Sequence, residues 1–282
     1  MPAQREFIVV GADDSAPPNR AIGWAADEAA RTGRDLLIVH VVDAPVHGSA
    51  EDTGDGARSV MESWSSVLRA GHEFAQRRQP GLTVETSLVR AGSASAGLKR
   101  HAAEATEVVI GHRGRGGFAE LLLGSTALHL AGHLPVPLII VRGQDMDQVG
   151  EVVAGLDLLT DPEPLLEHAF AAAEARGARL RALHAWHPAP LAVEAGADLQ
   201  VVENTLRDHL ASALAPWRDR HPDVKVVEDV GLGHAVHRLI LASAHADLVV
   251  VGSHGPALPL GSVAHGVIHH ADCPVAVVHA RG

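Results

Sequence analysis

The chain has 282 residues, enough for two ordinary domains, and 46% of them are apolar. Its formal net charge of −11 argues against a nucleic-acid or anionic membrane surface as partner. A single cysteine, Cys273, excludes an intramolecular disulfide and favours a reducing, cytoplasmic setting. The N-terminus lacks an apolar leader and the apolar runs have strand length, so we expect neither a signal peptide nor a membrane span.

The same order of landmarks occurs twice along the chain. The paired segments are 10–13 and 154–157, 37–40 and 181–184, 109–111 and 250–252, and 124–125 and 261–262. The spacing within a pair falls from 144 to 137 residues, which indicates two copies of one domain with small insertions and deletions. We predict domains at 1–143 and 150–282, joined by a short polar segment that keeps them adjacent.

Strand and helix patterns alternate through the first copy. Strands are predicted at 7–11, 36–42, 83–89, 107–111 and 137–142, and helices at 19–31, 58–79, 94–105 and 125–133. The near-continuous apolar run at 36–42 is typical of a parallel strand that is buried on both faces. The second copy follows the same plan, so the predicted fold class is α/β, with two tandem, doubly wound, five-stranded parallel-sheet domains of Rossmann-like form.

A glycine-rich segment, residues 111–125, follows the apolar run at 108–110 and leads into a helical pattern. Its glycines allow a ligand to approach the backbone, and the helix that begins at Gly124-Ser125 favours a bound anion. Arg113 and Arg115 add positive charge. The spacing matches neither a Walker A motif nor the dinucleotide fingerprint. We interpret the segment as a phosphate-binding loop at the carboxyl end of a strand.

Two further positions lie at carboxyl strand ends, where open parallel sheets bind ligands. Asp13 can accept a hydrogen bond from a ribose hydroxyl or a base amino group, although it could instead cap the helix that follows. The backbone of Val41 can bond a base edge while its side chain packs on the base, although a valine here could simply be core.

The spacing of the loop, with two residues between Gly111 and Gly114 and nine before Gly124-Ser125, resembles the ATP-binding signature of the universal stress protein family. This resemblance implies a fold of the adenine nucleotide alpha hydrolase-like type, an adenine nucleotide as ligand, and ATP with magnesium carried on the triphosphate. The expected nucleotide-binding residues are Ala12, Asp13, Val41, Ile110, Gly111, Arg113, Gly114, Gly124, Ser125 and Thr126, with Arg113 included for its charge.

The corresponding loop of the second copy, residues 252–262, is shorter and contains no arginine. Five residues separate Gly255 from Gly261, and Pro256 and Pro259 each remove a backbone donor. Ala185 stands where the first copy has Val41. We therefore expect weak or absent nucleotide binding there, with the retained glycines and Ser262 leaving a binding-competent short loop as the alternative.

The histidines occur as i, i+4 pairs in both copies, at 129 and 133 and at 265 and 269. Two histidines do not complete the usual zinc ligand set, so we expect no metal site. Cys273 is expected to be a buried, inert thiol.

The resemblance also implies that fifth strands pair, which would make the tandem an intramolecular pseudo-dimer through 138–141 and 275–278; a further homodimer stays open. The leading hypothesis is an ATP-binding regulator or sensor without catalytic residues. A slow ATPase or nucleotidyl transferase on the same fold and an interaction module that binds no nucleotide are the alternatives.

Overall fold

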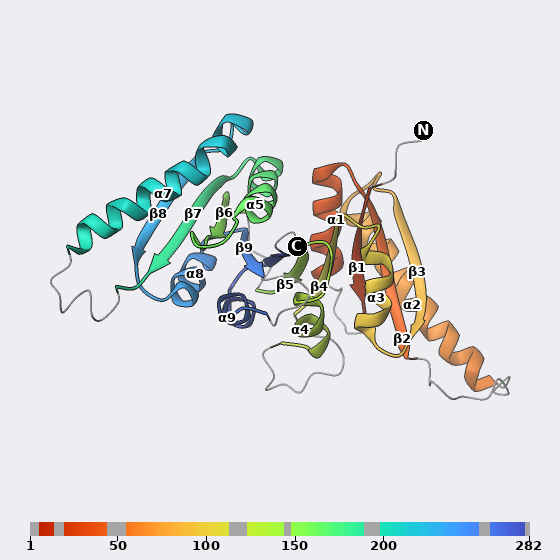
Figure 1. The fold of residues 1–282 in the computed structure, drawn as a ribbon. Helices are drawn as coiled ribbons and strands as arrows, with labels where there is room; N and C mark the ends of the chain where they lie inside the picture. Colours follow the sequence, from red (N-terminus) through yellow and green to blue (C-terminus); the bar gives the residue numbers. More distant parts are fainter. Residues whose placement is uncertain are drawn as a thin grey trace. The chain divides into compact units, whose positions relative to one another are not determined.

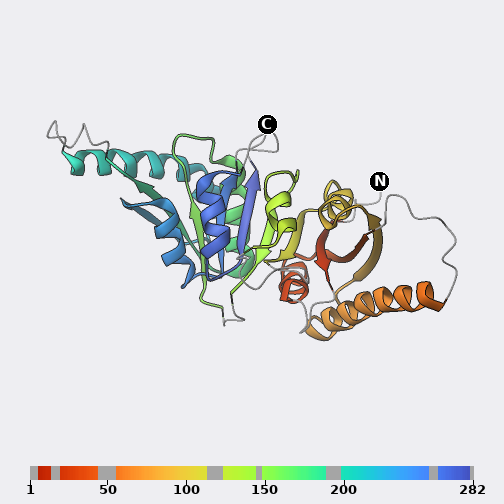
Figure 2. The same ribbon diagram turned by 90° about the horizontal axis from the view of Figure 1, so that it is seen from below.

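The computed structural model describes residues 6–13, 20–43, 55–112, 123–143, 148–188, 198–253 and 260–279. The chain divides into two compact units, Met1–Arg142 and Gly143–Gly282. Each unit alternates strands with helices around its own parallel sheet, as Figures 1 and 2 show. The predicted fold class, two tandem doubly wound α/β repeats, is confirmed.

Within its described residues, the first unit has five parallel strands in the order β3-β2-β1-β4-β5. Its elements are β1 (Phe7–Ala12), α1 (Arg20–Thr32), β2 (Asp35–Asp43), α2 (Asp55–Arg78), β3 (Val84–Ala91), α3 (Ala94–Ala102), β4 (Glu107–Gly111), α4 (Ser125–Ala131) and β5 (Leu138–Val141). The chain crosses from β3 at one edge to β4 beside β1, so the strand order reverses between β1 and β4. This reversal is the topological switch point at which such sheets bind ligands.

The second unit repeats this plan in the order β8-β7-β6-β9-β10, again with parallel neighbours. Its elements are β6 (Glu151–Gly155), α5 (Glu163–Arg176), β7 (Arg179–Trp186), α7 (Leu199–Arg220), β8 (Val226–Leu232), α8 (Ala235–Ser243), β9 (Leu248–Ser253), α9 (Ser262–His270) and β10 (Val275–His279). Its switch point lies between β6 and β9.

Helices cover both faces of each sheet, which explains the continuous apolar runs of the central strands. In the first unit α1 contacts α2 and α3 contacts α4, and in the second α5 contacts α7 and α8 contacts α9 (Figures 1 and 2). Val9, Val108 and Ile139 are fully buried. A strand with both faces covered has no polar face, and its sequence therefore lacks alternation.

A glycine in the first strand of each unit makes room for a leucine from the third helix. A Cβ atom on Gly11 would lie 3.3 Å from Leu98, and one on Gly155 would lie 2.9 Å from Leu239. The same contact therefore recurs in both repeats. It draws α3 and α8 close to the carboxyl ends of β1 and β6, where the candidate sites are found.

Most element boundaries lie within two or three residues of their predicted positions. The largest differences are of three residues: α2 begins at Asp55 instead of the expected Arg58, and α3 ends at Ala102 instead of the expected Ala105. The N–H of Glu104 donates to the carbonyl of His101, a tighter turn that closes the helix early.

Candidate functional site

The described residues of the first-repeat site meet at the carboxyl edge of the sheet. Asp13 directly follows β1, and Val41 lies near the end of β2, the neighbouring strand. Gly111 ends β4 on the other side of β1. Asp13 and Gly111 thus flank the switch point between β1 and β4, and Val41 lies on the next strand.

The two described ends of the predicted phosphate-binding loop lie close together. The N–H of Gly124 donates to the carbonyl of His112 at 2.9 Å, so both ends of the loop lie beside the end of β4. Arg113 and Gly114 lie outside the described residues. The hydrogen bond brings the start of α4 to the carboxyl end of β4.

The start of α4 offers backbone donors to a ligand. Gly124 is the N-cap, with φ −72° and ψ 148°, and no side chain of the described residues caps the helix. Ser125 is exposed, Thr126 is half-buried, and the helix continues into buried Ala127 and Leu130. Uncapped N–H groups and the positive end of the helix dipole favour an anion at this place.

Two of the predicted residues can act only through their backbone. The side chains of Ala12 and Ile110 are 7% and 5% exposed, so they belong to the core. Val41 is half-buried and packs on α3: a Cβ atom on Gly97 would lie 2.6 Å from both of its methyl carbons. Part of the Val41 side chain is therefore core, which is the alternative that the sequence left open.

A buried histidine that the sequence analysis missed supports the end of β1. His40 on β2 donates from Nδ1 to the carbonyl of Ala12 at 2.8 Å and is 7% exposed. Because a carbonyl only accepts, the proton must sit on Nδ1. The bond fixes the backbone directly before Asp13. The recurrence of this histidine as His184 was the signal that could have identified it.

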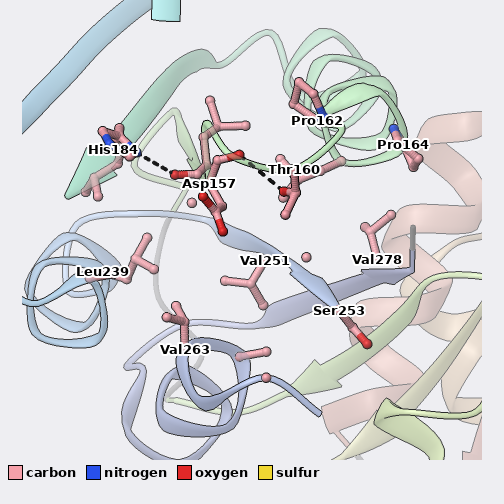
Figure 3. Close-up of a pocket in the computed structure, with 18 of the residues that line it drawn as sticks. Asp157, Thr160, Pro162, Pro164, His184, Leu239, Val251, Ser253, Val263 and Val278 are labelled. Atoms are coloured by element: carbon pink, nitrogen blue, oxygen red, sulfur yellow. Dashed lines mark hydrogen bonds between the residues drawn. The ribbon is translucent and has the colours of Figure 1, made fainter. Parts of the chain in front are cut away.

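The second repeat contains a cavity of about 480 Å³ at the equivalent place (Figure 3). It is lined by the ends of β6, β7 and β9 and by the start of α9, including Asp157, Ala185, Gly252 and Ser262. Pockets for small molecules measure about 300–1,000 Å³. The described residues therefore leave room for a ligand in a repeat whose sequence predicted weak or absent nucleotide binding.

Asp157 makes a turn and also faces the cavity. Its Oδ1 accepts from the N–H of Leu159 at 3.0 Å, and its carbonyl accepts from the hydroxyl of Thr160 at 3.2 Å. The carboxylate points into the cavity in Figure 3. Asp157 can therefore form this turn and still take a ligand role like the one predicted for the equivalent Asp13.

His184 repeats the contact of His40. It donates from Nδ1 to the carbonyl of Leu156 at 2.9 Å and is 9% exposed. The ring also lines the cavity. On the opposite side, His279 Nδ1 and Ser253 Oγ are 3.1 Å apart.

The histidine pairs and Cys273 are the other candidate groups that the sequence contains. The rings of His129 and His133 stack with centroids 5.0 Å apart, and those of His265 and His269 lie 4.5 Å apart. In the part of the chain that the structure describes, no group of three or more histidine, cysteine or acidic residues could hold a metal ion. Cys273 is buried, as predicted.

Among the helices that the structure describes, none is both long enough and apolar enough to cross a bilayer.

Comparison with known proteins identifies the repeat unit. The family model described as "Universal stress protein family" matches residues 5–142 and again 149–279. A universal stress protein of Mycolicibacterium smegmatis is 36% identical over 288 residues, covering 97% of each chain. A universal stress protein of Mycobacterium tuberculosis is 33% identical over 293 residues, covering 98% of each chain.

A solved structure shows the same fold in tandem. The crystal structure of a universal stress protein from Archaeoglobus fulgidus superposes with a TM-score of 0.69 and 18% sequence identity. The match covers 99% of this chain and 100% of the other, so the likeness extends over both repeats.

Proposed function

The chain belongs to the universal stress protein family, and on that premise we propose that it is a regulatory protein that binds ATP in its first repeat. The nucleoside lies between Asp13 and Val41, and the phosphates lie against the loop that follows β4. Magnesium arrives on the triphosphate. Binding changes the exposed surface of this repeat, which is how a sensor reports the nucleotide.

The observation that carries the proposal is the bond from Gly124 N–H to the carbonyl of His112. It holds the uncapped start of α4 at the switch point, beside the strand ends that hold Asp13 and Gly111. An anion at the helix start and a nucleoside over β1 can therefore be parts of one ligand. The loop spacing that resembles the family's ATP-binding signature supports the same assignment.

Identification of the released nucleotide tests the proposal. The purified protein is denatured, and the supernatant is analysed by mass spectrometry, followed by calorimetric titration of nucleotide-free protein with ATP. Gly124→Arg fills the anion site and should lower ATP affinity by at least about tenfold. Gly92→Arg is the matched control, because Gly92 is exposed and a Cβ atom there meets nothing within 4 Å.

The outcomes separate the hypotheses. ATP binding that Gly124→Arg abolishes and Gly92→Arg preserves supports the first-repeat site. Absence of any bound nucleotide, with no heat of binding when ATP is added, contradicts the proposal and favours an interaction module. Release of ADP or another product during incubation would instead favour the enzyme hypothesis.

A further inference from the structure

The walls of the second-repeat cavity are apolar. Leucine and valine side chains come from four elements and a turn: Leu156 after β6, Leu165 on α5, Leu239 on α8, Val251 on β9 and Val263 on α9. Four of them are less than 8% exposed, and Val263 reaches 36%. Such walls suit a flat organic ring, with a few polar groups at the rim to orient it.

The charged groups at this cavity are acidic. Asp157 and Asp161 both line it, and the described lining residues include neither lysine nor arginine. The segment 252–262 contains no lysine or arginine in its sequence either, whereas the first repeat carries Arg113 and Arg115 in the matching loop. A polyphosphate here would meet two like charges without a fixed cation to offset them.

The other polar groups at this cavity can bind the hydroxyl or amino groups of a ligand. The Asp157 carboxylate points into the cavity, and only its Oδ1 has a described partner, the N–H of Leu159. Opposite it, Gly261 is the N-cap of α9 and makes no side-chain cap hydrogen bond, so the first N–H groups of the helix can donate to an acceptor on the ligand. Acceptor and donors thus stand on two sides of an apolar space.

We propose that the second repeat binds an uncharged molecule of nucleoside size, whose hydroxyl or amino groups donate hydrogen bonds to the Asp157 carboxylate. The same site discriminates against nucleoside polyphosphates. The inference goes beyond the ATP site of the first repeat, and neither depends on the other. The two repeats would then respond to two different classes of ligand within one chain.

Photo-crosslinking of the whole chain tests this proposal with 8-azidoadenosine as the probe. Labelled peptides are assigned to each repeat by mass spectrometry, and unlabelled adenosine and ATP are titrated as competitors. We expect labelling in the second repeat that adenosine displaces at a concentration at least about tenfold below that of ATP. No second-repeat label, or equal displacement by ATP, overturns the proposal. Labelling of the first repeat by 8-azido-ATP reports the ATP site separately.

A charge-gain variant tests the electrostatic cause. Val263→Arg places a cation on the cavity wall beside the start of α9 and should bring ATP competition to within about threefold of adenosine. Val201→Arg is the matched control, since Val201 is 60% exposed on α7 and does not line the cavity. Unchanged selectivity in Val263→Arg, with the protein folded by circular dichroism, contradicts the assignment of selectivity to charge.

Discussion

His40 donates a hydrogen bond of 2.8 Å to the carbonyl of Ala12, and both groups are buried at the carboxyl edge of the first sheet. The second repeat reproduces the bond between His184 and Leu156 at 2.9 Å. In each case a side chain from the second strand of the repeat holds the backbone at the carboxyl end of the first strand, at Ala12 in β1 and at Leu156 directly after β6. The aspartate that follows is thereby presented at the switch point.

The first prediction concerns this bond. His40→Ala leaves the Ala12 carbonyl without its partner and should lower the free energy of unfolding by about 1–3 kcal/mol. It should also weaken ATP binding, because the backbone before Asp13 is no longer fixed. Chemical denaturation and calorimetry measure the two effects.

His184→Ala is the control for the His40 prediction. It breaks the equivalent bond in the second repeat, so it should cost similar stability without changing ATP affinity in the first. Equal loss of ATP binding in both variants would show that the effect comes from general destabilisation.

The second prediction concerns a buried carboxylate of the second repeat. Glu151 is 1% exposed and accepts hydrogen bonds from Arg179 and Arg181 on the neighbouring strand. Burial alone would raise the pKa of Glu151, but the hydrogen bonds and charges of Arg181 and Arg179 outweigh it and hold the pKa below the usual 4.5.

A folded pKa below the unfolded one means that this carboxylate stabilises the protein above about pH 4.5, and that the stabilisation is lost as pH falls through the lower folded value. Glu151→Gln should therefore lower the free energy of unfolding by about 1–3 kcal/mol at pH 7. It should also flatten the acid limb, which is the fall in stability as the pH decreases below about 4.5. Urea titrations from pH 3 to pH 7 measure both. Glu73→Gln is the control, because its pair with Arg77 is exposed. An unchanged acid limb in Glu151→Gln would refute the assignment.

The third prediction concerns the start of the second repeat. The Asp247 carboxylate accepts from the N–H groups of Val149, Gly150 and Glu151, at 2.7, 2.8 and 3.2 Å. Asp247→Ala removes all three acceptor contacts and should cost about 1–3 kcal/mol, with faster amide exchange at residues 149–151. Asp247→Asn retains one oxygen and should recover part of the protection. Exchange rates equal to wild type in Asp247→Ala would disprove the role.

The fold could be predicted because its signals are local and repeated. Apolar strand runs, helix periodicity and two copies of the same landmarks determine the alternation, and the alternation determines a parallel sheet. The glycines at 111 and 124 were likewise recognisable from their place after an apolar strand. Each of these features is visible within a short stretch of chain.

The missed features depend on contacts between distant residues. His40 lies inside an apolar strand and reads as core until its bond to Ala12, 28 residues away, is seen. The second-repeat cavity was also missed. A sequence shows which cationic side chains and N–H donors are present, but it does not show the space that remains between residues such as Leu239 and Val251. Sequence spacing therefore led to a predicted ligand position at the carboxyl ends of the strands, but not to the groups that support or surround it.

The last prediction concerns a pair of positions that differ between the repeats. In the first, Val41 fits against Gly97, where a Cβ atom would lie 2.6 Å from the valine methyls. In the second repeat, the matching strand position holds the small residue Ala185, and the matching helix position holds the large residue Arg238. Gly97→Ala should therefore clash with Val41 and destabilise by about 1–3 kcal/mol.

A second substitution tests the cause of that loss. Adding Val41→Ala to Gly97→Ala removes the methyls that clash and imitates the small strand residue of the second repeat, so most of the lost stability should return. Thermal unfolding of both single variants and the double variant gives the coupling energy directly. Simple additivity of the two losses would mean that Gly97 is required for another reason. Because Val41 is also a proposed nucleoside contact, ATP affinity should stay reduced in the double variant even after its stability is restored.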